Sequence, residues 1–171
     1  MSMDRIKQSI GKLSAYLGEH PQKAVSQDPP AVAVLESGLR CRAQGPRGAS
    51  LATDMPTAVG GESSAPTPGW LLRAALASCD ATVIAMRAAQ LGIVLDKLEV
   101  TVDSESDNRG LLGLAESAPA GPLGVRVTVR LSAPGTPEEA VRALVDWAEK
   151  HSPVSDAMRR ALPVATQLIV E

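Results

Sequence analysis

Residues 67–92 read TPGWLLRAALASCDATVIAMRAAQLG, and this stretch decides the fold. Thr67 is a typical N-cap residue and Pro68 suits the first helical position, whereas Gly92 supplies a C-terminal stop. After Gly69 no helix breaker interrupts the stretch. The sequence therefore predicts one long helix.

Apolar residues recur along this helix at helical spacing, and the opposite side is mostly alanine. A helix that is apolar nearly all round is usually enclosed by other elements. We therefore expect a central buried helix that carries Cys79 near its middle. The expected apolar stripe comprises Leu72, Ala75, Leu76, Cys79, Val83, Met86 and Ala89.

The composition indicates a globular protein with an aliphatic core. The chain has 171 residues, of which 44% are hydrophobic, and it contains no Phe, one Tyr and two Trp. This length fits one domain, or one domain with an appendage. The shortage of aromatic residues disfavours a base-stacking surface, and a net charge of −2 gives no electrostatic reason to expect nucleic acid as a partner.

The sequence also indicates a compartment. No apolar run approaches the roughly 20 residues needed to span a bilayer, and the N-terminus MSMDRIKQSI lacks the apolar core of a signal peptide. We therefore expect no membrane association and a cytoplasmic location. Two cysteines do not make a disulfide framework, so both are expected to be thiols there.

The segments before residue 67 predict a helix, a connector and a small sheet. Residues 3–18 carry apolar side chains at helical spacing, and the proline-bracketed segment 20–30 is typical of a connector. The predicted organisation is thus an N-terminal helix and connector over 1–30 and a main domain over 31–171, with the helix packing on that domain or serving as a dimer contact. Residues 31–53 predict a hairpin or short meander with a GPRG turn.

Arg40, Cys41 and Arg42 lie on the second strand of this meander. Neighbouring side chains of a strand point to opposite faces. Either both arginines share one face and Cys41 takes the other, or the strand is bulged. The segment 55–66 that follows should be an ordered loop, and its Gly60-Gly61 pair lacks the spacing and the lysine of a phosphate-binding loop.

Two alternating patterns after Gly92, around residues 98–102 and 125–131, predict strands with one buried face each. Their exposed faces carry opposite charges, which favours antiparallel pairing with cross-strand ion pairs. The acidic segment between them has Asn108 and Leu114 where a calcium loop has Gly and Glu, so it is expected to be a solvated loop.

The last quarter of the chain predicts two helices and a strand. Thr136, Pro137 and Glu139 form a capping-box pattern that should open a helix over 137–150. Ser152 should cap a short helix that ends near Ala161. The final segment VATQLIV, residues 164–170, is expected to be a strand.

The candidate chemistry centres on the thiol of Cys79. The chain lacks HExxH, CxxC and GxSxG motifs and has only two histidines, so neither a metal site nor a cofactor is predicted. A thiolate in mid-helix gains little from the helix dipole, so its activation would need a guanidinium from the early hairpin. Buried cysteines are also common as small core residues, and that reading stays open.

Arg73, Asp80 and Arg87 form a line of charges on the otherwise apolar helix. Either they face solvent or another subunit, or Asp80 orients an arginine near the thiol.

Taken together, the segment from Leu51 to Ile93, the strands LEVTV and VRVTVRL, the capped helix and HSPVSDAMRRAL resemble the OsmC/Ohr family of osmotically inducible and organic hydroperoxide resistance proteins. The similarity covers roughly residues 31–171. It implies an α+β fold in which a curved antiparallel sheet wraps two central helices, with the extra N-terminal helix appended. It also implies an intertwined homodimer with sites at the subunit interface.

The resemblance implies roles for particular residues. Cys79 matches the reactive cysteine of the family's peroxidases, and Arg47, or else Arg40, matches their arginine. Ser152 occupies the position of the resolving cysteine, and Gly69 that of the glutamate that holds the arginine. Two functional positions therefore depart from the family pattern.

These matches leave two functions open. The first is a one-cysteine, thiol-dependent peroxidase that reduces organic hydroperoxides through Cys79, with Arg47, Arg40, Asp80 and Ser152 in support and an external thiol as reductant. The second is a non-catalytic dimer that binds a small apolar ligand.

Overall fold

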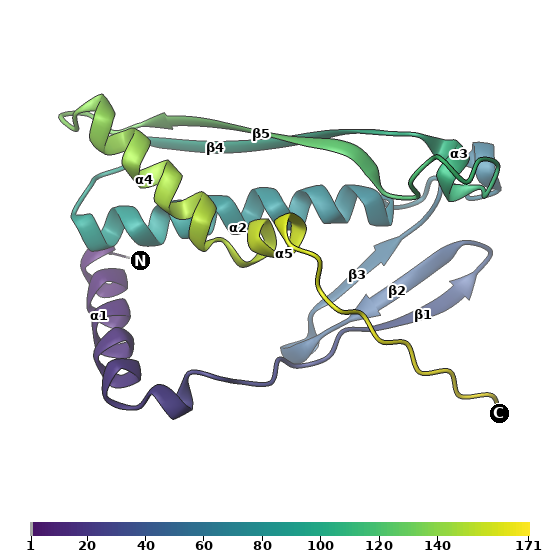
Figure 1. Cartoon of the computed structure of the whole chain (residues 1–171), viewed down its shortest axis with the longest axis horizontal. Helices are drawn as coiled ribbons and strands as arrows, with labels where there is room; N and C mark the ends of the chain where they lie inside the picture. Colours follow the sequence, from purple (N-terminus) through teal and green to yellow (C-terminus); the bar gives the residue numbers. More distant parts are fainter. Residues whose placement is uncertain (1) are drawn as a thin grey trace. The chain divides into compact units, whose positions relative to one another are not determined.

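The computed structural model describes residues 2–171 and confirms the α+β class (Figure 1). Short 3-10 turns at Pro21–Lys23, Pro46–Gly48 and Thr57–Val59 join some of the elements. In chain order the helices and strands are α1 (Met3–Glu19), β1 (Val32–Ser37), β2 (Arg40–Gln44), β3 (Ser50–Thr53), α2 (Pro68–Leu91), β4 (Lys97–Ser106), α3 (Asn108–Leu111), β5 (Pro122–Ser132), α4 (Glu138–His151) and α5 (Pro153–Arg159).

Contacts divide the chain into two compact units. One unit consists of Gln8–Ala74 and contains the antiparallel sheet β1-β2-β3. The other consists of Ala75–Glu171 with residues 2–7, and it contains the antiparallel pair β4-β5, most of α2, and helices α3 to α5.

The predicted central helix is present with the predicted ends. The hydroxyl of Thr67 accepts a hydrogen bond from the backbone N–H of Trp70 at 3.2 Å, as an N-cap does. Gly92 follows the last helical residue with φ +72°, a left-handed conformation that glycine adopts without strain.

The buried face of α2 differs from the predicted stripe. Leu72 and Met86 are about 40% exposed, and Asp80, which one of the two interpretations places on a solvent or subunit face, is only 2% exposed. The predicted stripe alternates spacings of three and four and stays on one side of the helix, whereas the buried row steps by four and winds slowly around it, following the elements packed against α2. The buried residues are Leu76, Asp80, Ile84, Ala88 and Ala89.

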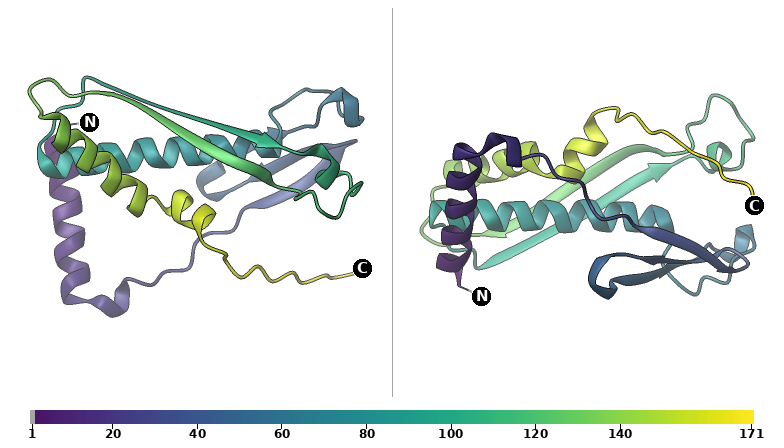
Figure 2. Two further views of the ribbon diagram at one scale, coloured as in Figure 1. Left: turned by 45° about the horizontal axis from the view of Figure 1, so that its top comes forward. Right: turned by 90° about the horizontal axis from the view of Figure 1, so that it is seen from below.

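The core of the second unit lies where α2 and α4 meet one face of the hairpin β4-β5. Ile84 and Ala88 of α2 pack with Leu144 and Ala148 of α4, and each of the four is almost completely buried. Figure 2 shows α2 running along this hairpin. The surrounding apolar side chains are Val83, Ile93, Leu95, Leu98, Val100, Val129, Leu131 and Val145.

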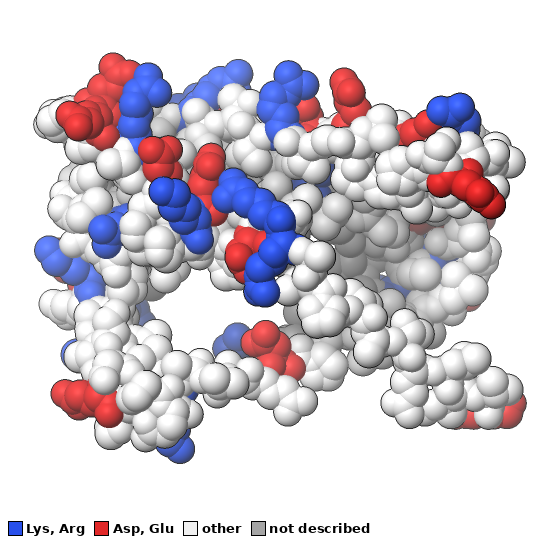
Figure 3. Space-filling model, viewed as in Figure 1, with Lys and Arg blue, Asp and Glu red and all other residues white. Residues whose placement is uncertain are grey.

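The outer face of β4-β5 carries the predicted ion pairs. Glu99 lies opposite Arg130 and Asp103 opposite Arg126 in the register, with N···O distances of 2.9 and 3.0 Å. Figure 3 shows side chains of both charges along this part of the surface. Such exposed pairs contribute about 0.2–1 kcal/mol each, so they favour this register without dominating stability.

The structure of the meander β1-β2-β3 shows which face of β2 carries Arg40 and Arg42. A register shift in β1 falls between Leu35 and Ser37. It places Glu36 where both Arg40 and Arg42 donate hydrogen bonds to its carboxylate. Both arginines thus share one face of a regular β2, and these bonds, Arg42's foremost, lower the pKa of Glu36.

The loop that precedes α2 is organised around the carboxylate of Asp54, which is 2% exposed. Its oxygens accept hydrogen bonds from the backbone N–H groups of Met55, Glu62 and Ser64 and from the Ser64 hydroxyl, at 2.7–3.2 Å. Gly61 permits the tight turn, since a Cβ atom there would lie 1.9 Å from the carbonyl oxygen of Met55. The segment is therefore the ordered loop that the sequence predicted.

Three local predictions are wrong. Pro137 is extended (ψ 143°) and itself holds the N-cap position of α4, so Thr136 lies one residue too early and makes no capping bond. The acidic segment between β4 and β5 includes the short helix α3, which the Asp107 side chain caps. Residues 164–170 form no strand, because this segment has no neighbouring strand with which to pair among residues 2–171.

The expectation about membrane-spanning length is also wrong as it was stated. By length and composition α2 is apolar enough to cross a bilayer, because its many alanines raise the mean hydropathy of one 18-residue window to 1.3. Core helices of soluble proteins that are mostly buried meet the same criterion, whereas 22% of this stretch of α2 is buried within the single chain.

The Asp54 loop generates a prediction about pH. Hydrogen bonds, those from Ser64 first, hold the pKa of Asp54 below its ordinary value of about 3.9. A depressed carboxyl pKa stabilises the fold above that ordinary value, and the stabilisation is lost as pH falls through the folded-state pKa. Asp54→Asn should therefore lower the urea midpoint at pH 7, and the difference from the parent should shrink at pH 3.

The matched control for this prediction is Asp28→Asn, which changes an exposed aspartate in the connector and should leave the midpoint unchanged at both pH values. If Asp54→Asn lowered the urea midpoint equally at pH 7 and pH 3, the charge of Asp54 would not contribute to stability.

Candidate functional site

The thiol of Cys79 contacts Ser152, the residue that joins α4 to α5. The hydroxyl of Ser152 donates a hydrogen bond to Cys79 Sγ over 3.2 Å. Ser152 is fully buried, whereas Cys79 is half-buried. The two residues are far apart in the sequence, so this contact depends on the packing of α2 with α4.

Ser152 is also the N-cap of α5. Its Oγ accepts a hydrogen bond from the backbone N–H of Ser155 at 3.4 Å, as predicted for a capping serine. A serine hydroxyl has one proton and two lone pairs. Because the cap uses a lone pair, the proton remains available for Cys79 Sγ.

Asp80 follows Cys79 on α2 and lies within the same cluster. Its Oδ1 accepts a hydrogen bond from Ser155 Oγ at 2.8 Å, and both residues are buried. Its Oδ2 is buried and has no hydrogen-bond partner among residues 2–171. Within its own unit, Asp80 thus binds a serine of α5 and not the arginine that one interpretation of the sequence proposed.

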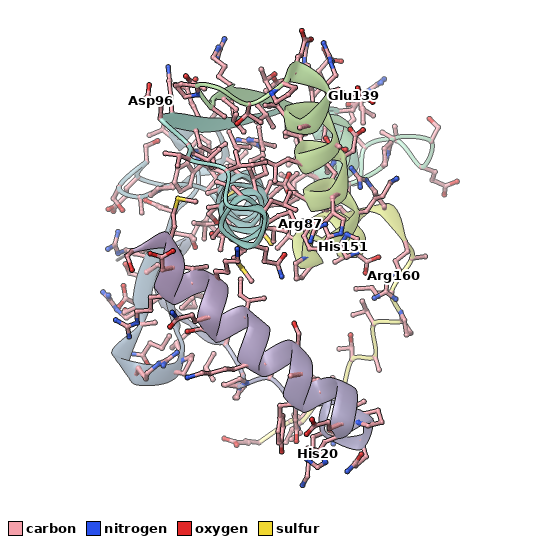
Figure 4. The ribbon with its side chains drawn as sticks, turned by 90° about the vertical axis from the view of Figure 1, so that its left-hand side faces the viewer. His20, Arg87, Asp96, Glu139, His151 and Arg160 are labelled. Carbon is pink, nitrogen blue, oxygen red and sulfur yellow. The ribbon has the colours of Figure 1, made fainter. Side chains whose placement is uncertain are left out.

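A stacked column of side chains lies next to Ser152. The rings of Trp147 and His151 stack with centroids 3.9 Å apart, and the guanidinium of Arg87 lies 4.5 Å from the indole centroid. Figure 4 shows Arg87 and His151 close to one another. Cation–π contacts of this kind contribute about 0.5–2 kcal/mol, so the column fastens the end of α4 to α2.

An open hollow of about 250 Å³ borders the cluster. Its walls are mostly apolar, and Ser155 belongs both to the hollow and to the hydrogen-bond network. The hollow is lined by Leu76, Val125, Val127, Ser155, Met158 and Arg159.

The two candidate arginines belong to the unit formed by Gln8–Ala74. Arg40 donates to Glu36 and, at 2.6 Å, to the hydroxyl of Ser64, which in turn donates to Asp54. Arg47 sits in the turn between β2 and β3 with φ +56°. Arg40 is therefore held in place by its neighbours in that unit.

The comparison with protein families decides the classification. The model of the OsmC family, described as OsmC-like protein, matches residues 60–167, which include Cys79, Asp80, Ser152 and Ser155. The chain belongs to the OsmC family. No curated protein matches it in sequence.

Solved structures of OsmC-type proteins share the fold. An OsmC-like protein from Mycoplasma pneumoniae has 16% identity and a TM-score of 0.67, with 79% of this chain and 89% of that chain covered. An organic hydroperoxide resistance protein OsmC from Legionella pneumophila has 24% identity and a TM-score of 0.58, with 79% and 91% covered. At these identities the likeness shows the fold alone.

A third OsmC-type structure holds a ligand. It is a putative organic hydroperoxide resistance protein from Vibrio cholerae with captopril bound in one of its active sites. It has 23% identity and a TM-score of 0.52, with 80% of this chain and 88% of that chain covered.

The structure brings three of the sequence-derived candidates into one cluster, namely Cys79, Asp80 and Ser152. Sequence reasoning missed Ser155. The sequence did contain a signal for Ser155, because it stands three residues after the predicted N-cap Ser152, and the backbone N–H of that position bonds to the cap side chain. It also missed the Arg87–Trp147–His151 column, which no local pattern indicates.

The geometry generates a prediction about Ser152→Cys. The oxygen and sulfur atoms are already 3.2 Å apart, and a disulfide requires about 2.05 Å, so a small shift should suffice. Mild oxidation should therefore join the introduced thiol to Cys79, as mass spectrometry of the non-reduced protein would reveal.

Ser78→Cys is the matched control for this prediction, because Ser78 is on the same helix but is exposed and donates to the Ala75 carbonyl. It should not form an internal disulfide with Cys79. If the folded Ser152→Cys variant kept both thiols free, the proximity of Ser152 and Cys79 would be refuted.

Proposed function

We propose that this OsmC-family protein is a one-cysteine peroxidase that reduces organic hydroperoxides with Cys79. The single observation that carries the proposal is the hydrogen bond from buried Ser152 to Cys79 Sγ. A hydrogen bond to an ionised acceptor is about twice as strong as one to a neutral acceptor. The Ser152 hydroxyl supplies such a donor to Sγ, the atom through which a cysteine reacts as a nucleophile.

The proposed reaction transfers one oxygen atom from the hydroperoxide to the sulfur of Cys79. The thiolate attacks one oxygen of the hydroperoxide, the O–O bond breaks, and the alkoxide leaves and takes up a proton to become an alcohol. Cys79 is thereby oxidised to a sulfenic acid. One external thiol condenses with it and releases water, and a second external thiol then reduces the mixed disulfide and restores Cys79.

Ser152 cannot take the part of a resolving thiol in this scheme, because a hydroxyl forms no disulfide. The apolar hollow next to Ser155 supports an organic substrate rather than a strongly polar one. The names of the Legionella and Vibrio proteins, both organic hydroperoxide resistance proteins, support the same substrate class.

An external reductant fits a cytoplasmic location, where thiols are kept reduced. We also propose that the OsmC domain spans residues 31–171 and that residues 1–30 are an addition to it.

The peroxidase proposal predicts the effect of Ser152→Ala. Loss of a hydrogen bond worth about 1.4 kcal/mol to the thiolate should slow the reaction of Cys79 with cumene hydroperoxide about tenfold. Stopped-flow mixing with a dione trap for sulfenic acid would measure this rate. Ser78→Ala should react at the parent's rate, and Cys79→Ser should not be trapped.

A second candidate function is a non-catalytic binder of a small apolar ligand. It is favoured by the apolar hollow and by the serine and glycine at positions 152 and 69. The same experiment separates the two candidates. A parent protein whose Cys79 stays unoxidised by hydroperoxide would refute the peroxidase and leave the binder.

We propose further that the protein is a homodimer. In this single chain, apolar side chains at the C-terminus, among them Val164, Leu168 and Val170, are largely exposed. Trp70 and Leu91 at the two ends of α2 are about half exposed. Exposed apolar surface of this kind marks an interface between molecules.

Light scattering at micromolar concentration should therefore report two subunits. Deletion of residues 163–171 should shift the equilibrium toward the monomer, since that segment would lose its contacts with the second copy. A parent protein that stays monomeric at 100 times that concentration would contradict the homodimer.

A further inference from the structure

We propose that Asp80 is a positioning residue for the thiol of Cys79. Its carboxylate holds the hydroxyl of Ser155, and Ser155 in turn holds Ser152 so that its proton points at Sγ. This inference rests on the proposed function of Cys79 and assigns the residues that keep its hydrogen-bond donor in place.

Asp80 is almost completely buried. The carboxylate is 2% exposed and lies on a helix face that is otherwise Leu, Ile and Ala. One of its oxygens has no hydrogen-bond partner among residues 2–171. Burying a carboxylate with so few partners opposes folding, so an apolar side chain at this position would pack at lower cost.

Two side-chain hydrogen bonds join neighbouring residues of α2 to the start of α5, one from Ser152 to Cys79 and one from Ser155 to Asp80. The other end of α5 is held to α4 by the hydrogen bonds of Arg159 to Glu149. The Ser155–Asp80 bond thus ties the turn that carries Ser152 to the helix that carries Cys79.

The cap bond of Ser152 determines where the hydroxyl proton of Ser152 points. The backbone N–H of Ser155 occupies a lone pair of Ser152 Oγ. Since Asp80 fixes Ser155, it also fixes the direction of this cap bond. The one remaining proton of Ser152 then points away from the cap and toward Cys79 Sγ.

The test measures position without requiring peroxidase activity. In the Ser152→Cys background, the protein is equilibrated with oxidised and reduced glutathione, quenched with acid, and analysed for the internal disulfide by mass spectrometry. Adding Ser155→Ala or Asp80→Ala should lower the equilibrium constant for that disulfide at least about tenfold, because the two thiols are no longer held together.

Asp80→Asn is the conservative variant, because an asparagine oxygen still accepts the Ser155 hydrogen bond. It should stay within about threefold of the Ser152→Cys background. Ser78→Ala, on the exposed side of α2, should not change the constant. Circular dichroism checks the fold of each variant, and if Asp80→Ala fails to fold, Ser155→Ala decides.

A second measurement uses the native serine. The rate of Cys79 alkylation by iodoacetamide should fall in Ser155→Ala to the level of Ser152→Ala, and the double variant should be no slower than Ser152→Ala. Non-additivity of this kind is expected if Ser155 acts through Ser152, whereas a general loss of stability would add to the effect.

An unchanged disulfide constant in Ser155→Ala, or additive alkylation rates, would overturn the positioning role of Asp80. Failure of the parent to reduce hydroperoxide, with these positional effects intact, would refute the proposed function alone.

Discussion

The packing of α2 against α4 is the constraint on which the rest of the second unit depends. Ile84 and Ala88 of α2 and Leu144 and Ala148 of α4 form one buried apolar cluster, which joins the two helices through their side chains. α5 begins directly after α4, so the position of α4 also sets the position of Ser152. A core built from alanine and aliphatic residues thereby places a hydroxyl against a thiol.

The long helix, the ion-paired hairpin and the capped α5 could be predicted from the sequence, because each depends on local signals. Thr67 and Gly92 mark the ends of α2, and alternating residues mark β4 and β5. The burial of Asp80 could not be predicted, because it depends on which face of α2 meets α4 and α5. A charge on an apolar helix indicates solvent unless a tertiary partner is known, and here that partner is Ser155.

The failed prediction of a terminal strand has a different cause. The apolar and β-branched residues of segment 164–170 favour a strand, but a strand exists only where another strand completes its hydrogen bonds. Among residues 2–171 of the single chain, no strand pairs with this segment. In the candidate site, Cys79 and Ser152 could be named from the family likeness, whereas the bond from Ser155 to Asp80 depends on how α5 packs against α2.

The Ser152–Cys79 contact also has a consequence for a serine-to-cysteine substitution at position 152. The side chains of serine and cysteine differ by one atom, and both can cap a helix or fill the same buried volume with little adjustment of the backbone. A cysteine at position 152 would thus place a second thiol against Cys79 without remodelling of the surrounding fold, because the α2–α4 core already fixes that position.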